Sequence, residues 1–142
     1  MKRTDFALYL VGALFTSAVS IQVCAAGDNP SYSGTWQAAD KSSELVVKQS
    51  GDAIHVTEQR GGRTLCDYTC NSDGKDCNFT EEGKKAKVAV YFNGPKLVEI
   101  RTRGNQVVKR RFGLTNNGKT LEVESMPIVP PGKTETTLYA KQ

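Results

Sequence analysis

The 142-residue sequence contains little of what most metal and catalytic sites require. It has one histidine, His55, and one tryptophan, Trp36. A metal site built from several histidines is therefore excluded. His55 alternates with the apolar residues Ile54 and Val56, which predicts an exposed position on a strand rather than a catalytic base. The 13 glycines and 5 prolines are too few for a collagen-like or low-complexity chain, and the 24% charged and 38% hydrophobic residues are typical of a folded protein.

Catalytic signatures are missing as well. The sequence contains no nucleophile elbow, no Cys-x-x-Cys and no paired carboxylates on a plausible cleft. We therefore predict that the protein is not an enzyme and has no catalytic residues, cofactor or metal. The formal net charge of +4 is also too small and too dispersed for a nucleic-acid binder.

Residues 1–26 are typical of a secretory signal peptide. A basic start at Lys2 and Arg3 precedes an apolar run over residues 6–15, and residues 23–26 place small side chains where signal peptidase reads them. Cleavage after Ala25 or Ala26 leaves residues 27–142 as one domain in the periplasm or outside the cell. The alternative of an uncleaved helical anchor requires about 20 apolar residues, and the alternative of a lipid anchor at Cys24 requires small residues where Gln22 and Val23 stand.

The pattern of the rest of the chain predicts short strands. Apolar and polar residues alternate over residues 54–57, 88–91, 98–101, 121–124 and 138–141, a period that places one face of each strand on a core. Turn signals such as Asp73-Gly74, Asn93-Gly94 and Asn117-Gly118 separate these segments and favour antiparallel hairpins. We therefore predict nine or ten strands near residues 32–37, 44–49, 53–60, 63–70, 76–80, 85–92, 96–103, 106–114, 119–126 and 133–141.

These strands predict an all-β fold, a single antiparallel up-and-down meander. Closure of the meander into a barrel would remove both exposed edges; a sandwich is the alternative, but no long crossover is visible. The segment from Met126 to Lys133 contains three prolines, and we expect it to be a loop that bends across one mouth of the barrel.

Motifs at both ends of this region resemble those of known small barrels. Residues 33–36, Ser-Gly-Thr-Trp with Gly34 and Trp36, resemble the Gly-x-Trp signature of lipocalins. From residue 31 onward the chain also resembles short secreted bacterial lipocalin-like proteins, in the order of its Tyr68 to Lys75 hairpin, its Asn117 to Leu121 hairpin and its closing Tyr-x-Lys strand. The resemblance implies a calycin-type barrel whose Trp36 packs across the closed end beneath Arg111 or Lys141, with no established activity.

Three cysteines remain after cleavage, in a compartment that favours disulfides. A hairpin centred on Asp73-Gly74 places Cys70 opposite Cys77, at a separation that suits a disulfide. Cys66 is four residues further along the strand and out of reach of Cys77. We expect it to be a buried free thiol; the alternative is an intermolecular disulfide.

Five basic residues gather on one predicted hairpin: Arg101, Arg103, Lys109, Arg110 and Arg111. Its turn at Gly104-Asn105 places Glu99 opposite Arg110, which compensates part of the charge. Two interpretations remain, a solvated strand face and an outer face that docks an anionic protein or surface.

The functional hypothesis is an exported, non-catalytic, monomeric binding protein with no membrane span after cleavage. Its ligand would be a small apolar molecule in a barrel cavity of at least about 300 Å³. The alternative is a periplasmic protein-interaction or inhibitor module that uses an outer face, because residues 68–70 before a glycine turn resemble the small-barrel inhibitors of lysozyme. A packed interior would favour this alternative.

The predicted export can be tested directly. N-terminal sequencing of the protein accumulated by its own cell should begin at Ala26 or Gly27, because the signal peptide is removed on export. A native product that retains residues 1–20 would contradict the prediction.

Overall fold

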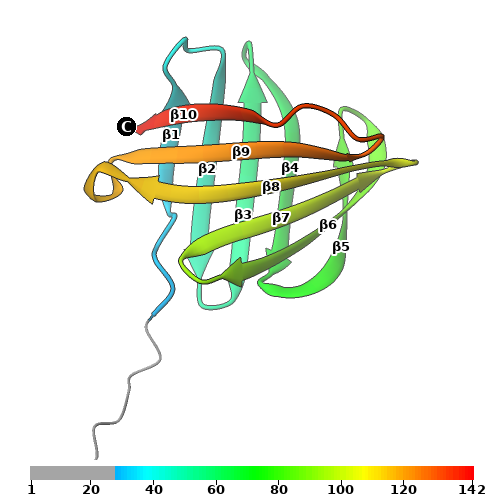
Figure 1. The fold of residues 1–142 in the computed structure, drawn as a ribbon, viewed down its shortest axis with the longest axis horizontal. Helices are drawn as coiled ribbons and strands as arrows, with labels where there is room; N and C mark the ends of the chain where they lie inside the picture. Colours follow the sequence, from blue (N-terminus) through cyan, green and yellow to red (C-terminus); the bar gives the residue numbers. More distant parts are fainter. Residues whose placement is uncertain (1–27) are drawn as a thin grey trace, which may run out of the picture.

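The computed structural model describes residues 28–142, so the predicted signal peptide and its cleavage site lie outside the described residues. Ten strands make up almost the whole region (Figure 1). They confirm the predicted strands to within a few residues at each end. Their bounds are β1 Gly34–Ala38, β2 Ser43–Ser50, β3 Ala53–Arg60, β4 Arg63–Asn71, β5 Asp73–Glu81, β6 Lys84–Asn93, β7 Lys96–Arg103, β8 Gln106–Thr115, β9 Thr120–Val129 and β10 Glu135–Lys141.

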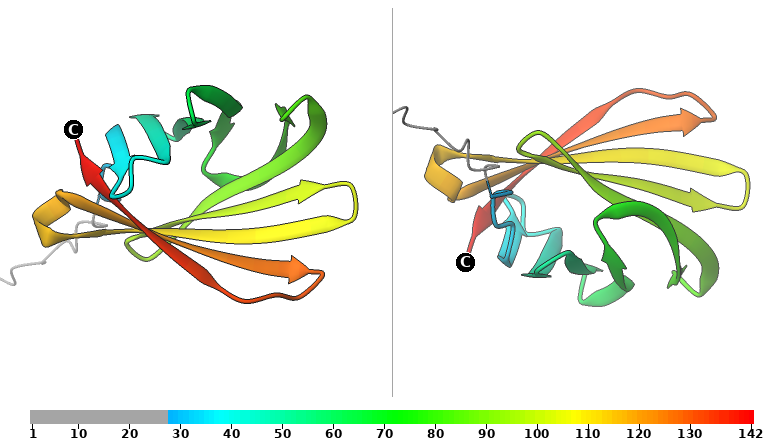
Figure 2. Two further views of the ribbon diagram at one scale, coloured as in Figure 1. Left: turned by 90° about the horizontal axis from the view of Figure 1, so that it is seen from above. Right: turned by 90° about the horizontal axis from the view of Figure 1, so that it is seen from below.

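The strands form a closed antiparallel barrel. Each strand pairs with the next along the chain, and β10 returns to pair with β1. The views from above and below show β1–β5 curving on one side and β6–β10 crossing them on the other (Figure 2). The meander and its closure into a barrel are thus confirmed against the sandwich. Closure leaves no sheet edge unpaired by a neighbouring strand.

The predicted loop from Met126 to Lys133 is only partly correct. Strand β9 continues to Val129, and Met126 pairs with Lys109 of β8 while Val129 pairs with Val107. The register shifts between these two pairs, next to Pro127, and such a bulge accommodates a proline that cannot donate a ladder hydrogen bond. The connection between β9 and β10 is therefore limited to residues 130–134.

One end of the barrel is closed by Trp36. This side chain is fully buried, and its Nε1 donates a hydrogen bond to the carbonyl of Tyr32 at 3.0 Å. Lys141 Nζ lies 5.3 Å from the centre of the indole ring, so the basic partner is Lys141 and not Arg111. A Cβ atom on Gly34 would lie 2.9 Å from Lys141 Cε, which explains the glycine of the signature.

Apolar side chains fill the half of the barrel next to this closed end. The Tyr32 hydroxyl lies 2.6 Å from the carbonyl oxygen of Pro95 and holds the segment before β1 under the barrel. The largest buried apolar side chains of this core are Trp36, Tyr32, Phe112, Leu45, Ile54, Leu97 and Leu121.

Strands β4 and β5 meet along the weakest seam of the barrel. Their ladder has one register pair, Cys66 with Glu81, and the predicted disulfide joins Cys70 to Cys77 across a Cα–Cα distance of 5.8 Å. Cys66 is free and buried, which confirms the expectation of a buried thiol. The disulfide therefore provides a covalent link where backbone hydrogen bonds are few.

Replacement of both cysteines of the disulfide by serine should lower the free energy of unfolding. The closed loop is short, so we expect a loss of about 2 kcal/mol, measured by urea unfolding with Trp36 fluorescence. Reduction of the unaltered protein should have a similar effect, whereas the double variant should not respond to reductant. If the unaltered protein also fails to respond, the disulfide contributes nothing to stability.

Candidate functional site

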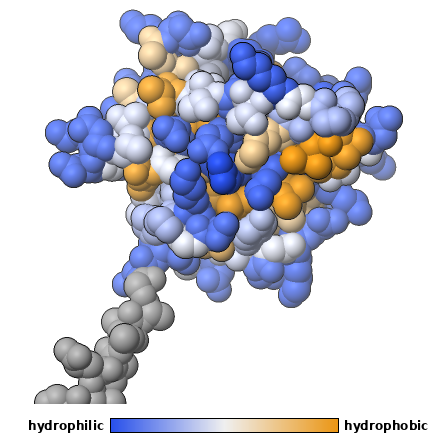
Figure 3. Space-filling view, viewed as in Figure 1, coloured by the Kyte–Doolittle hydropathy of each residue, from blue (hydrophilic) through white to orange (hydrophobic). Residues whose placement is uncertain are grey.

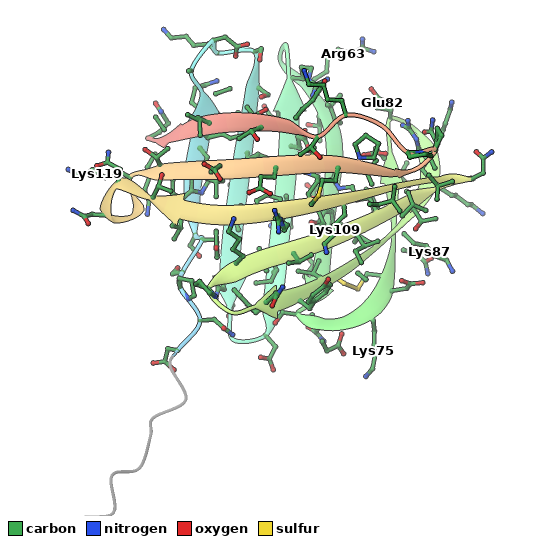
Figure 4. The ribbon with its side chains drawn as sticks, in the orientation of Figure 1. Arg63, Lys75, Glu82, Lys87, Lys109 and Lys119 are labelled. Atoms are coloured by element: carbon green, nitrogen blue, oxygen red, sulfur yellow. A yellow bond between two sulfur atoms is a disulfide. The ribbon has the colours of Figure 1, made fainter. Side chains whose placement is uncertain are left out.

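The other end of the barrel opens at a mouth lined by charged side chains. The cavity there has a volume of about 270 Å³ and lies among β3, β4, β5, β7 and β8. Arg63 and Glu82 lie together at this end in Figure 4, whereas Lys119 and Lys75 lie far from it. The lining consists of Glu58, Arg60, Leu65, Glu81, Glu82, Arg101, Arg103, Gln106, Val108 and Arg110.

Four charged side chains form a buried cluster inside the barrel, and three of them, Glu58, Arg101 and Arg110, line the floor of this cavity. Glu99 of β7 is 0% exposed; its Oε1 accepts a hydrogen bond from Arg101 Nη2 at 2.9 Å, and its Oε2 lies 3.3 Å from Arg110 Nη1. Glu58 of β3 completes the set, because its Oε2 lies 2.9 Å from Arg110 Nη1 and 3.3 Å from Arg101 Nη1. We call these four residues the floor cluster. Each of its charges faces two of opposite sign, which offsets the cost of removing them from water.

Two further groups contact the floor cluster from β4. The Tyr68 hydroxyl donates a hydrogen bond to Glu99, and its ring packs against Phe79 with centroids 5.2 Å apart. The Cys66 thiol lies 3.9 Å from Glu58 Oε2. Burial raises the pKa of Cys66 to about 11. Burial, reinforced by Glu99, also raises the pKa of Tyr68. Both groups are therefore protonated at neutral pH and are not activated nucleophiles.

The pKa values of the two carboxyl groups in the floor cluster are lowered, whereas those of Cys66 and Tyr68 are raised. Burial opposes ionisation of Glu99, yet Arg101 and Arg110 hold its pKa below the usual value. The pKa of Glu58 is lowered against burial by the same two guanidinium groups. Ion pairing thus outweighs desolvation for both carboxylates, and the cluster is a set of four charges at neutral pH.

A second, more exposed set of ion pairs lies above the floor cluster. Arg103 Nη1 lies 3.1 Å from Glu82 Oε2 and 3.4 Å from Glu81 Oε2. The side chains of Arg103 and Glu82 are 32% and 57% exposed. Glu81 also lies 3.0 Å from Arg101 Nη1, so it joins the two sets. The pair of Arg103 with Glu82 is exposed, and exposed ion pairs contribute little free energy, so this contact can exchange for another.

Among the buried side-chain atoms of the described chain, Arg101 Nε has no hydrogen-bond partner. The same arginine lines the cavity, and its guanidinium carbon lies 5.8 Å from the Tyr68 ring centre. A buried donor without an acceptor costs free energy. Glu99 Oε2, a buried acceptor, also has no hydrogen-bond partner, so the floor cluster keeps one donor and one acceptor that its ion pairs do not satisfy with hydrogen bonds.

The structure divides the predicted basic hairpin between two faces. Arg101, Arg103 and Arg110 point into the mouth, while Lys109 and Arg111 lie on the outside of β8. The expectation that these five basic residues share one outer face is therefore wrong. Arg111 pairs there with Glu124 of β9. The predicted position of Glu99 opposite Arg110 is correct, but this pair is buried instead of solvated.

The cavity at the mouth also differs from the apolar ligand cavity that the sequence predicts. The cavity at the mouth is smaller than about 300 Å³, the lower range for ligand pockets. Its lining is charged because Glu58, Arg101 and Arg110 take inward positions. Sequence reasoning missed Glu58 and Tyr68 as parts of this site. The signal for Glu58 was present, since it continues the inward alternation of Ile54 and Val56.

The outward residues of β3 and β4 provide a contrast to the mouth. His55 Nε2 lies 2.7 Å from Asp67 Oδ1, across the two strands, as expected for a half-exposed strand residue.

Within residues 28–142, no group of three or more His, Cys, Asp and Glu residues could hold a metal ion. No helix in this part of the chain is long and apolar enough to cross a membrane.

Known structures share the barrel. A secretory abundant heat soluble protein from Ramazzottius varieornatus matches with a TM-score of 0.66 at 13% identity, over 78% of this chain and 95% of that one. Secretory abundant heat soluble protein 4 from the same organism gives 0.62 at 15% identity, over 78% and 94%. The "REP1-NXSQ fatty acid transporter" gives 0.59 at 14% identity, over 70% of each chain. No family model matches the sequence, and no curated protein does. At these identities the likeness concerns the fold alone, a closed, lipocalin-like antiparallel β-barrel.

The substitution Glu99→Gln should destabilise the barrel and reduce its sensitivity to acid. At pH 7 it removes the shared partner of two buried guanidinium groups, and we expect a loss of about 3 kcal/mol. The pKa of Glu99 is lowered in the folded state, so its stabilisation is complete above the unfolded value of about 4.3 and disappears as the pH falls through the folded-state value. The unaltered protein should therefore lose more stability than the variant between pH 7 and pH 3.

Urea unfolding at both pH values, followed by Trp36 fluorescence, measures this difference. The control is Glu135→Gln, which neutralises an exposed carboxylate and should behave like the unaltered protein at both pH values. Equal acid sensitivity of the Glu99 variant and the control would show that the floor cluster does not govern acid stability.

Proposed function

We propose that this chain is an exported, non-catalytic binding protein that takes a small ligand with an anionic group, a carboxylate or a phosphate, into the mouth of the barrel. The observation that carries the proposal is the cavity of about 270 Å³, whose lining has four arginines beside three glutamates. Arginine presents several donors in a plane that suits both anions.

The two sets of ion pairs support different roles within this site. The floor cluster is buried and holds Arg101 in a fixed position. Above it, Arg103 is held by the partly exposed Glu81 and Glu82. A ligand anion would displace the exposed carboxylate of Glu82 at little cost, and it would then accept hydrogen bonds from Arg103.

The size of the cavity favours a small ligand. A volume of about 270 Å³ lies just below the usual range of about 300–1,000 Å³ for ligand pockets. Below the mouth, apolar side chains such as Leu45, Ile54 and Leu121 fill the barrel and leave little space for a long chain. The fatty acid transporter of similar fold is named for a ligand with a carboxylate, and we propose the same chemical group on a shorter molecule.

The groups at the mouth support binding over catalysis. The two protonated side chains of the site, Cys66 and Tyr68, have raised pKa values, whereas a nucleophile or general base needs a pKa tuned toward the working pH. The charged residues compensate one another and are arranged to hold a charge rather than to transfer a proton.

Calorimetric titration tests the proposal with hexanoate, hexyl phosphate and hexanol, which share an alkyl chain and differ in charge. We expect at least one anion to bind, and hexanol to bind at least about tenfold more weakly, because it cannot form charge-assisted hydrogen bonds. The comparison of the two anions distinguishes a carboxylate site from a phosphate site. Equal binding of hexanol and both anions, or no binding of any, would contradict the proposal.

Two matched variants locate the site. Arg103→Gln removes a guanidinium group at the mouth and should weaken the bound anion about tenfold. Arg111→Gln removes one from the outer face of the same strand pair, where it contacts Glu124, and should leave the affinity unchanged. The reverse result would place the anion on the outer face.

A further inference from the structure

The rim of the mouth carries an apolar surface that the barrel core does not use. Among the large hydrophobic side chains of residues 28–142, only Ile128, Val129 and Leu138 are exposed, by 47%, 47% and 51%. Ile128 and Val129 are adjacent at the end of β9, next to the mouth, and Figure 3 shows hydrophobic surface over the ends of β8 and β9. Exposed Pro130 and Pro131 follow directly, and their fixed φ angles restrict the turn that presents this pair.

Basic side chains surround the same rim. Lys84 and Lys85 follow the turn between β5 and β6, Lys133 lies between β9 and β10, and Arg63 begins β4. All four are exposed, and none belongs to an ion pair formed within residues 28–142. Their charges are therefore free to meet an external anionic surface.

The topology brings these residues to one end of the molecule. The turns β3–β4, β5–β6, β7–β8 and β9–β10 follow one another around the mouth because each strand pairs with the next. Arg63 and Glu82 line one surface hollow and lie together in Figure 4. We call Arg63, Lys84, Lys85, Ile128, Val129 and Lys133 the rim patch.

We propose that the rim patch docks the barrel, mouth first, onto the surface of an anionic lipid membrane. The two aliphatic side chains would enter the boundary between headgroups and acyl chains, and the basic side chains would contact the lipid phosphates. An acidic protein is the less favoured partner, because protein interfaces are enriched in aromatic residues and depleted of lysine. The rim patch has three lysines and no aromatic side chain.

This inference does not rest on the proposed anion site, and vesicle binding is measured without added ligand. The protein, purified in the form that its cell accumulates, is sedimented with vesicles of phosphatidylcholine, with and without phosphatidylglycerol. We expect binding only to the anionic vesicles and a decrease at high salt, because salt screens the attraction. The Lys84→Glu/Lys85→Glu and Ile128→Ser/Val129→Ser variants should each bind about tenfold more weakly.

Matched controls make the same kinds of change, a charge reversal and a loss of apolar area, away from the rim. Lys48→Glu/Lys119→Glu reverses two exposed lysines away from the rim, and Leu138→Ser removes the third exposed aliphatic side chain. Both should bind vesicles as the unaltered protein does. Binding that ignores the rim substitutions, equal binding to neutral vesicles or no binding at all would overturn the proposal. Binding to polyglutamate without binding to vesicles would overturn it in favour of an acidic protein. Titration of the rim variants with hexanoate and with hexyl phosphate should match that of the unaltered protein, so the two proposals fail separately.

Discussion

The pairing of β1 with β10 is the constraint on which the rest of the structure depends. It places Trp36 directly opposite Lys141, and so sets the ammonium group over the indole ring at the closed end. Because the ring of strands is complete, a slip of one residue in any strand would turn its side chains from the interior to solvent. Closure therefore determines which side chain of each strand faces inward, including those that are charged.

The interior charges follow from this inward alternation and must be balanced inside the barrel. Glu58 reaches the interior from β3, Glu99 and Arg101 from β7, and Arg110 from β8. The two carboxylates and two guanidinium groups pair with one another, so the net charge of the cluster is zero. Buried ion pairs seldom stabilise a fold more than apolar side chains of similar volume would. A structural role alone thus explains the cluster poorly, and its position beneath the cavity favours a role in holding the arginines for a ligand.

Much of the fold could be predicted from the sequence, because turn residues mark every hairpin after the first and the register around Asp73-Gly74 places Cys70 opposite Cys77. The inward face was predicted less well. In β7 the apolar residues Val98 and Ile100 alternate with Glu99 and Arg101, yet the latter pair faces the interior. In β10 the adjacent residues Leu138 and Tyr139 are both hydrophobic, so alternation does not choose between them; Leu138 is exposed and Tyr139 belongs to the core. Alternation identifies the inward face only where the interior is apolar, and the mouth half of this barrel is not. Glu58 of β3 pairs with arginines of β7 and β8. Because these strands are far apart in the sequence, no local pattern predicts the ion pairs.

The inward face of β7 shows how the two halves of the barrel are joined. Leu97 belongs to the apolar core, Glu99 is buried in the floor cluster, Arg101 bridges to Glu81, and Arg103 is 32% exposed at the mouth. Along this one strand the inward side chains change from apolar core residues to buried ion pairs, and then to an exposed arginine at the mouth. A rigid lower half thereby positions the guanidinium groups, because Glu99 and Glu58 restrict Arg101 while leaving its Nε without an acceptor. Pre-positioned donors lose little conformational entropy on binding an anion, so the stability of the closed end and the anion binding that we propose for the open end rest on the same strand.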